Sequence, residues 1–189
     1  MEMIATKLVS YLDTDKTMWN DIERLQMILG MQVLLHNIIM MGTILIIARL
    51  TGMFQEAVIL LAAYGVLKTA AGGIHFKRSS ACLLATETFV TSGILISRHL
   101  HMRLAHIILI YIVCLAILAV IGPQGTENNP ISEENFGKLK RMAIWIISVY
   151  LILTIVMAIY MKHIPYLLFI AVVFETLSLL PSYLKNRRH

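Results

Sequence analysis

The chain has 189 residues, of which 58% are hydrophobic and only 14% are charged, and its mean hydropathy is +0.77. Soluble domains carry about a quarter charged residues, so this composition excludes an ordinary soluble domain and indicates an integral membrane protein. The formal net charge is +5, from 16 Lys and Arg against 11 Asp and Glu.

The first 27 residues are not apolar enough to span a membrane, but their apolar side chains repeat at helical spacing. Ile4, Leu8 and Tyr11 form one such series, before a break at "DTD". This pattern is typical of an amphipathic helix on a membrane surface, with Trp19 as an anchor at headgroup level. We expect residues 1–27 to be an interfacial helical segment, either an ordinary lead-in to the first span or a docking element for a substrate. They show no cleavable signal peptide, so we expect the first span to stay in the mature protein.

Six apolar stretches follow, each long enough to cross a hydrocarbon core, which takes roughly 17–25 helical residues. They lie near 28–48, 53–71, 80–97, 104–122, 142–161 and 164–184. Each run is continuous rather than alternating, which favours helices over strands. We therefore predict an all-α polytopic membrane protein. It is expected to be one domain over 1–189, with a bundle of six transmembrane helices over 28–184 and a basic tail over 185–189.

The Lys and Arg residues predict the orientation of these spans. With the N-terminus in the cytoplasm, 12 of the 16 lie on the cytoplasmic side and 4 lie outside. The twelve are Lys7, Lys16, Arg24, Lys68, Lys77, Arg78, Lys138, Lys140, Arg141, Lys185, Arg187 and Arg188, and the four are Arg49, Arg98, Arg103 and Lys162. Because cytoplasmic loops are enriched in Lys and Arg, both termini are expected in the cytoplasm. This asymmetry accounts for most of the net charge, so we do not interpret the charge as nucleic-acid binding.

A long polar loop, "GPQGTENNPISEENFGKLKR", separates the fourth and fifth spans at 122–141. Its first half is dense in turn-forming residues. Ser132 is expected to cap a short helix in its second half, with acidic residues in the first turn and basic residues near the end.

The stretch "AAGGIHFKRSSAC", at 70–82, joins the second and third spans and contains His75 and Cys82. A thiolate is a strong nucleophile, and histidine is the usual base that generates it because its ordinary pKa is roughly 6.5. Lys77 and Arg78 lie between the two residues, and positive charge favours the thiolate, as does the start of a helix.

The spacing of this pair demands a bend in the chain. On an unbroken helix the two side chains would lie about 10 Å apart along the axis, which is too far for proton transfer. Gly72 and Gly73 permit the chain to fold back. From spacing alone, the pair is either catalytic or no more than a solvated histidine and a packed cysteine.

The motif "AGGIH" followed by Cys82 resembles the accessory gene regulator B (AgrB) family. Three further motifs are similar to that family in order and spacing, and the chain length is also similar: "LGMQVLLHNI" at 29–38, "IGPQGTENNPIS" at 121–132 and "ETLSLLP" at 175–181. These proteins are membrane cysteine endopeptidases of Gram-positive bacteria that process the propeptide of a cyclic quorum-sensing pheromone.

The resemblance implies that His75 and Cys82 are the catalytic residues and that Gly73 is the glycine of the family's motif. The family commonly has an arginine seven residues before the histidine, where this chain has Lys68. Lysine keeps the positive charge but loses the two-pronged guanidinium, so contacts to a substrate carboxylate would differ.

The implied substrate is a propeptide with an amphipathic leader, a central segment bearing Cys or Ser, and an acidic tail. Cys82 would release the tail and hold the central segment as a thioester, which the substrate's own Cys or Ser would then close into a thiolactone or lactone ring. Lys68, Lys77 and Arg78, around a thiol at the cytoplasmic face, suit an acidic tail. We expect no cofactor and no nucleic acid as a partner, a site at the inner face of the cell membrane, and either a monomer or a homodimer.

Other polar residues are weaker candidates. Glu87 and Glu175 fall inside predicted spans, where an ionisable group is costly, so each is either functional or a protonated structural glutamate. Glu175 is the better candidate for orienting His75. The pair His99 and His101 has metal-like spacing but is expected across the bilayer from Cys82, so no metal site is predicted. Cys114 is expected to be inert packing, because it lies in mid-span.

Two other classes of function are alternatives for this sequence. In a small transporter or exporter, Glu87, Glu175 and Lys68 would mark the transport pathway, but the sequence shows no repeated half and no obvious pair of broken helices. A non-enzymatic membrane scaffold is the other alternative. A neighbouring reading frame that encodes a leader, a Cys or Ser and an acidic tail would favour the peptidase over both.

Overall fold

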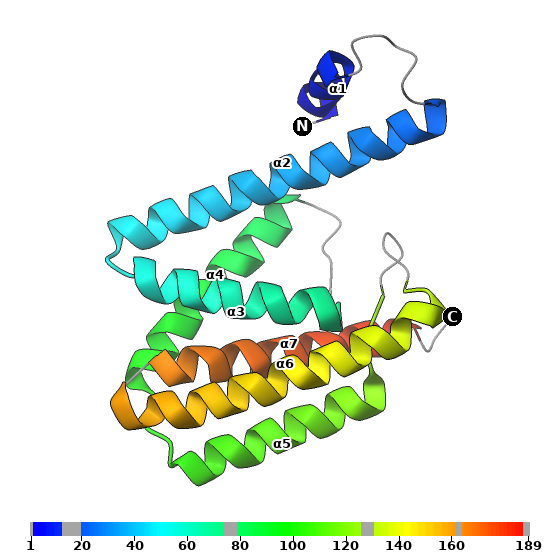
Figure 1. The fold of residues 1–189 in the computed structure, drawn as a ribbon. Coiled ribbons are helices and arrows are strands. Elements are labelled where there is room, and N and C mark those ends of the chain that lie inside the picture. Colours follow the sequence, from blue (N-terminus) through cyan, green and yellow to red (C-terminus); the bar gives the residue numbers. More distant parts are fainter. Residues whose placement is uncertain (1, 13–19, 74–78, 126–130, 162–163, 187–189) are drawn as a thin grey trace. The chain divides into compact units, whose positions relative to one another are not determined.

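The computed structural model describes residues 2–12, 20–73, 79–125, 131–161 and 164–186, and in these ranges the chain is all-helical, with seven helices. Figure 1 shows the helices coloured by their order in the sequence. The chain divides into two compact units, residues 1–52 and residues 53–189, which are described separately. The all-α prediction is confirmed for the described residues.

The first unit consists of α1 (Glu2–Leu12) and α2 (Asp21–Leu50), which contact each other. In α1 the buried side chains are the small ones, Ala5 and Val9. The larger series predicted for a membrane surface, Ile4, Leu8 and Tyr11, is exposed. This arrangement leaves a bulky apolar face of α1 free for a lipid surface.

The start of α2 follows from its first residues. The Asn20 backbone N–H donates to Glu23 Oε2 at 2.9 Å, as in a capping box, and Asp21 and Glu23 lie in the positive first turn. The helix then continues without interruption into the apolar stretch predicted from residue 28. The last residues of the predicted interfacial segment, 21–27, are therefore part of α2, the first apolar helix.

The second unit contains α3 (Phe54–Ala71), α4 (Ser79–His99), α5 (Leu104–Ile121), α6 (Glu133–Tyr160) and α7 (Ile164–Asn186). Helix α7 contacts each of the other four, and Figure 1 shows α3, α5 and α6 running beside it while α4 crosses obliquely. Buried apolar side chains of α3, α5, α6 and α7 form one core around Tyr111 and Ile147. The helix that supplies Glu175 is thus the central one.

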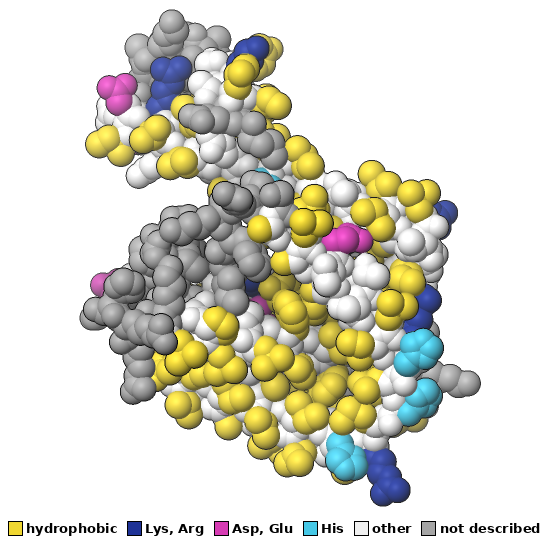
Figure 2. All heavy atoms as spheres, turned by 180° about the vertical axis from the view of Figure 1, so that it is seen from behind, with side chains coloured by type: hydrophobic (Ala, Val, Ile, Leu, Met, Phe, Trp, Pro, Cys, Tyr) yellow, Lys and Arg dark blue, Asp and Glu magenta, His cyan; other side chains and the backbone are white. Residues whose placement is uncertain are grey.

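Five of the described helices are long and apolar enough to cross a membrane: α2, α3, α5, α6 and α7. The protein is therefore a multi-pass membrane protein. Figure 2 shows the broad hydrophobic surface that such a protein presents to lipid. The predicted third span is α4, which is helical over the expected residues but is not among these five. The count of six spans and the placement of both termini in the cytoplasm stay predictions.

The loop that precedes α6 differs from the expectation of a separate short helix. The helix begins at Glu133 and runs unbroken to Tyr160. Its first turn is closed by the Ser132 carbonyl, which accepts the N–H groups of Asn135 and Phe136 at 3.0 Å each, rather than by the Ser132 hydroxyl. The predicted start is confirmed, but the short helix is simply the first turns of the fifth predicted span.

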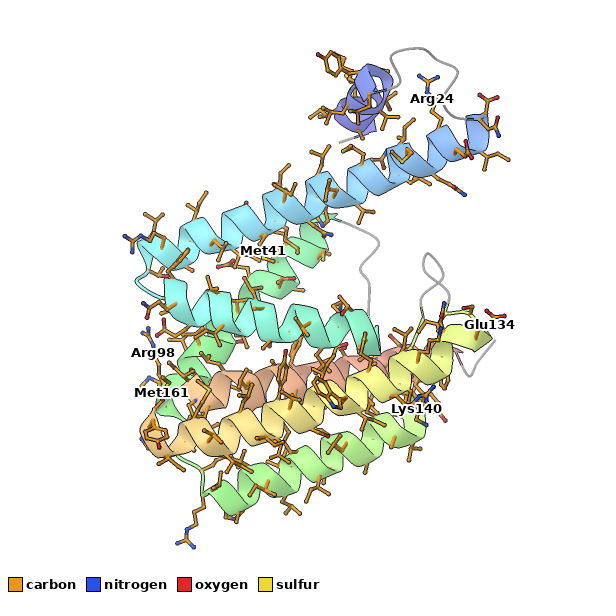
Figure 3. All side chains as sticks on the ribbon, viewed as in Figure 1. Arg24, Met41, Arg98, Glu134, Lys140 and Met161 are labelled. Carbon is orange, nitrogen blue, oxygen red and sulfur yellow. The ribbon has the colours of Figure 1, made fainter. Side chains whose placement is uncertain are left out.

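Different residues mark the two ends of the five-helix unit. Glu56, at the start of α3, accepts hydrogen bonds from Arg98 Nη2 at 2.5 Å and Nε at 3.2 Å at the end of α4. Figure 3 shows Arg98 and Met161 at this end, and Glu134 and Lys140 at the opposite end. The candidate site lies at the end that holds Glu134 and Lys140, where α3 finishes.

Candidate active site

The turn after α3 is built from backbone pairing with a distant loop. The Gln124 N–H donates to the Ala71 carbonyl at 2.9 Å, and the Gly73 N–H donates to the Gln124 carbonyl at 3.1 Å, which forms an isolated parallel bridge. Gly72 has a φ of 78°, and a Cβ built on it would lie 2.2 Å from the Gln124 carbonyl oxygen. Only glycine fits at this position, because both the dihedral angle and the close approach exclude a side chain.

The second glycine brings the same turn against α7. Gly73 has a φ of 100°, and its Cβ would lie 2.6 Å from Ser178 Oγ and 3.3 Å from Glu175 Oε1. The backbone of Gly73 thus lies directly on the polar face of α7. The described part of this turn therefore ends beside the Glu175 carboxylate.

Glu175 is a buried carboxylate with incomplete hydrogen bonding. Its side chain is 1% exposed, and Oε2 accepts a hydrogen bond from Ser178 Oγ at 3.3 Å. Oε1 is buried and has no hydrogen-bond partner among the described residues. A buried carboxyl group is best accommodated beside a group of opposite charge, and the ammonium of Lys68 interacts with it electrostatically.

Tyr64 interacts with Lys68, with Glu175 and with the thiol of Cys82. Lys68 Nζ, one helical turn farther along α3, donates to the Tyr64 hydroxyl at 2.9 Å. Tyr64 also interacts electrostatically with Glu175 and with Cys82. The interacting groups therefore come from three helices: Lys68 and Tyr64 from α3, Cys82 from α4 and Glu175 from α7.

Three aromatic rings hold these helices together beside the polar groups. Phe89 of α4 stacks on Phe174 of α7 with ring centroids 3.9 Å apart, and Tyr64 lies 5.0 Å and 5.6 Å from the two rings. Cys82 precedes Phe89 by seven residues, so both lie on one face of α4, about 10 Å apart along its axis. The aromatic cluster thereby fixes the helix that carries the half-buried Cys82.

Of the residues predicted from the sequence, the structure brings Lys68, Gly73, Cys82 and Glu175 into one region. His75, Lys77 and Arg78 lie outside the described residues. Lys68 is engaged inside the protein, with Tyr64 and Glu175.

Sequence reasoning missed three members of this region. Tyr64 was readable from its spacing of four residues before Lys68, and Ser178 from its spacing of three residues after Glu175. Gln124 carried no local signal, because its role depends on pairing with a turn far away in the sequence.

The remaining candidates lie apart from this region. Cys114 belongs to the apolar core and is 5% exposed, in agreement with a packing role. His99 is the last residue of α4 and Cys82 lies in its first turns, so 17 residues of helix separate them by roughly 25 Å. Glu87 accepts a hydrogen bond from Thr91 at 3.4 Å. The described part of the chain contains no cluster of three or more His, Cys, Asp and Glu side chains that could hold a metal ion.

Comparisons with known proteins agree with this picture. Residues 2–179 match the family model of accessory gene regulator B. A relative from Clostridium acetobutylicum, named putative AgrB-like protein, is 25% identical over 181 residues, which cover 95% of this chain and 83% of the relative. A relative from Staphylococcus aureus (strain Newman), named accessory gene regulator protein B, is 25% identical over 162 residues, which cover 86% of this chain and 84% of the relative. No solved structure matches the chain with significance. The family model covers nearly the whole chain, and the chain therefore belongs to the accessory gene regulator B family.

Proposed function

We propose that this protein is a membrane-embedded cysteine endopeptidase that removes the C-terminal tail of a pheromone propeptide and allows the remainder to cyclise. Family membership supports this proposal. The observation that carries it is the Glu175 carboxylate beside Gly73, two residues before His75 in the sequence, together with the interactions of Glu175 with Lys68 and Tyr64 and of Tyr64 with Cys82. Cys82 supplies a nucleophile, Lys68 a positive charge and Glu175 a buried carboxylate. Cleavage of a peptide by a thiol uses groups of these kinds.

The proposed reaction has two steps that balance in atoms and protons. His75 accepts the Cys82 thiol proton, the sulfur attacks the carbonyl carbon at the junction with the tail, and the C–N bond breaks as His75 returns that proton to the leaving amine. The substrate's own thiol or hydroxyl then attacks the Cys82 thioester. Its C–S bond breaks, the ring closes, and the proton of the attacking group restores the Cys82 thiol.

The acidic tail is assigned to Lys77 and Arg78. Lys68 is already bonded to Tyr64 and faces Glu175, so its charge is used within the site. Lys77 and Arg78 follow His75 in the sequence and supply the positive charge that an acidic leaving peptide requires.

The site is proposed to face the cytoplasm, because 12 of the 16 Lys and Arg residues fall on the side that contains it. In a Cys114→Ala background, a membrane-impermeant maleimide should label Cys82 only after permeabilisation of the cells. A matched variant, Arg103→Cys with Cys82→Ala, should be labelled in intact cells, because Arg103 is an exposed residue of a loop expected outside. Labelling of Cys82 in intact cells would show that the predicted orientation is wrong and that the site faces outward.

The test of the proposed function is the dependence of the yield on the released tail. Conversion of an amide to a thioester is uphill, and ring closure by a thiol replaces one thioester with another, so the advantage of the second step is rate rather than free energy. Purified protein in bilayers should therefore convert only part of a propeptide. Excess synthetic tail should lower the yield, and a peptidase that degrades the tail should raise it. Complete conversion to a linear acid, regardless of added tail, would identify a plain hydrolase.

A further inference from the structure

Two adjoining cavities lie at the end of the five-helix unit that is opposite to the candidate active site. The first, of about 310 Å³, lies between α5, α6 and α7, and its walls include the apolar side chains of Ile107, Ile155 and Pro165. The second, of about 680 Å³, is lined in part by Arg98 and His101. The two cavities share Ala158, Ile159, Met161 and Tyr166. Both volumes fall within the roughly 300–1,000 Å³ that is common for ligand sites.

Arg98 offers hydrogen-bond donors to the second cavity. Its Nε and Nη2 atoms donate to Glu56 at 3.2 Å and 2.5 Å, and Nη1 has no hydrogen bond among the described residues. The Arg98 side chain is 37% exposed. Figure 3 shows it at the same end of the unit as Met161, which lines both cavities. The ion pair therefore holds the guanidinium in place while leaving one edge for a further acceptor, such as a phosphate oxygen.

His101 offers a second polar group to the same cavity. Its Nδ1 lies 2.8 Å from the His99 carbonyl oxygen, and because a carbonyl only accepts, Nδ1 carries the hydrogen of this bond. Nε2 is left for another partner, and the protonated ring donates through it. An anion in this cavity can therefore accept hydrogen bonds from a guanidinium and from an imidazolium.

The loop that joins α4 to α5 is basic. The stretch "SRHLHMR", at 97–103, contains two arginines, two histidines and no acidic residue. Glu56 offsets one of the two arginine charges, and the exposed Arg103 supplies the other. Tyr160 is 81% exposed, and tyrosines at the ends of spans are typical of the boundary between membrane and water. This end of the unit therefore presents positive charge at the depth of lipid headgroups.

We propose that the two cavities bind one anionic phospholipid, with its phosphate at Arg98 and His101 and part of an acyl chain in the apolar cavity between α5, α6 and α7. The polar cavity adjoins the loop and the apolar cavity lies between the helices, which is the order of the two parts of a lipid. Basic pockets between transmembrane helices hold lipid headgroups for this reason. The cavities lie at the other end of the unit from Cys82, so the inference does not depend on the proposed function.

The test uses the purified full-length chain in detergent and native mass spectrometry. Phosphatidylglycerol and phosphatidylcholine with identical acyl chains are added separately, so that only the headgroups differ. One phosphatidylglycerol should stay bound per chain, with an affinity about 10-fold above that of phosphatidylcholine, because the basic loop repels the choline cation. Equal retention of the two lipids would overturn the proposal. Binding of glycerol phosphate, which has no acyl chain, as tightly as phosphatidylglycerol would also overturn it.

Variants of the polar cavity test the headgroup contacts. Arg98→Gln combined with Glu56→Gln removes both charges of the ion pair, so no unpaired charge remains to disturb the fold. This double variant, and separately His101→Ala at an exposed position, should lower the affinity for phosphatidylglycerol several-fold with unchanged circular dichroism. Arg103→Gln is the matched control, because Arg103 belongs to the same loop but lines neither cavity. A loss as large in Arg103→Gln would show a general attraction of charge and overturn the site.

A pair of variants on α6 tests the cavity itself. Ala158 is exposed and lines both cavities, so Ala158→Phe would fill space that the lipid requires without disturbing the core. It should lower the affinity for phosphatidylglycerol several-fold. Val156→Phe is the control, since Val156 is 49% exposed on the same helix and lines neither cavity. Unchanged binding in Ala158→Phe, or equal losses in the two variants, would overturn the proposal.

Discussion

Replacement of Cys82 by alanine is expected to abolish propeptide cleavage, with a loss of roughly 1,000-fold or more, because the reaction then lacks the atom that forms the thioester. The change should not impair folding. Cys82 lies in the first turns of α4 and is only half-buried, so its removal leaves a small gap at the edge of the unit. Quantitative detection of the released tail, with membrane insertion measured in parallel, checks this expectation.

Cys114→Ala is the control that the chain itself provides. Cys114 is the other cysteine and lies in the apolar core beside Tyr111 and Leu118. Alanine there removes one buried sulfur, and we expect a loss of about 1 kcal/mol in stability with cleavage intact. Cleavage by Cys82→Ala, or its absence from a folded Cys114→Ala protein, would refute the assignment of the nucleophile.

Gly72→Ala is expected to have the second-largest effect, on the geometry of the site rather than on its chemistry. The added Cβ would have to occupy space 2.2 Å from the Gln124 carbonyl oxygen, at a φ of 78°. We expect a destabilisation of about 3 kcal/mol or more, since strain and backbone displacement add. The turn that leads to His75 would separate from the Gln124 loop, so cleavage should fall to background. Thermal unfolding and tail release measure the two consequences.

Gly65→Ala is the matched control within the same helix. A Cβ there would meet nothing within 4 Å, and Gly65 has helical dihedrals inside α3. Alanine should therefore stabilise α3 by roughly 0.5–1 kcal/mol and leave cleavage unchanged. If Gly72→Ala behaved like Gly65→Ala, the bridge between Gly72 and Gln124 would have no role in the active protein.

Much of this fold follows from local patterns in the sequence. Apolar runs longer than about 17 residues predict the helices, and the paired glycines predict the end of α3. Both predictions depend only on neighbouring residues. Continuous apolar runs mark the membrane core but not the polar turns that extend a helix beyond it, which is why α2 and α6 begin earlier than the apolar stretches do.

The site itself required contacts between distant residues. His75, Cys82 and Lys68 were found by residue type and family motif, and Glu175 because a carboxylate inside a span is costly. Nothing local shows that the Gln124 loop pairs with Ala71 and Gly73, since such pairing is decided by the packing of α5, α6 and α7. The spacing of Tyr64 from Lys68 predicts a contact within α3. Only the contacts of its ring with α4 and α7 show where Tyr64 lies among the helices of the site.

The most direct test of the central claim is mass spectrometry of Cys82 after incubation with a propeptide whose internal Cys or Ser is replaced by alanine. Such a substrate can be cleaved but cannot close its ring, and a site that excludes water should hold the intermediate. The thioester mechanism predicts a covalent adduct on Cys82 with the mass of the propeptide without its tail. Hydroxylamine should remove this adduct, and it should be absent from Cys82→Ala. Release of the tail with no adduct on Cys82, or with an equal yield from Cys82→Ala, would contradict the thioester mechanism.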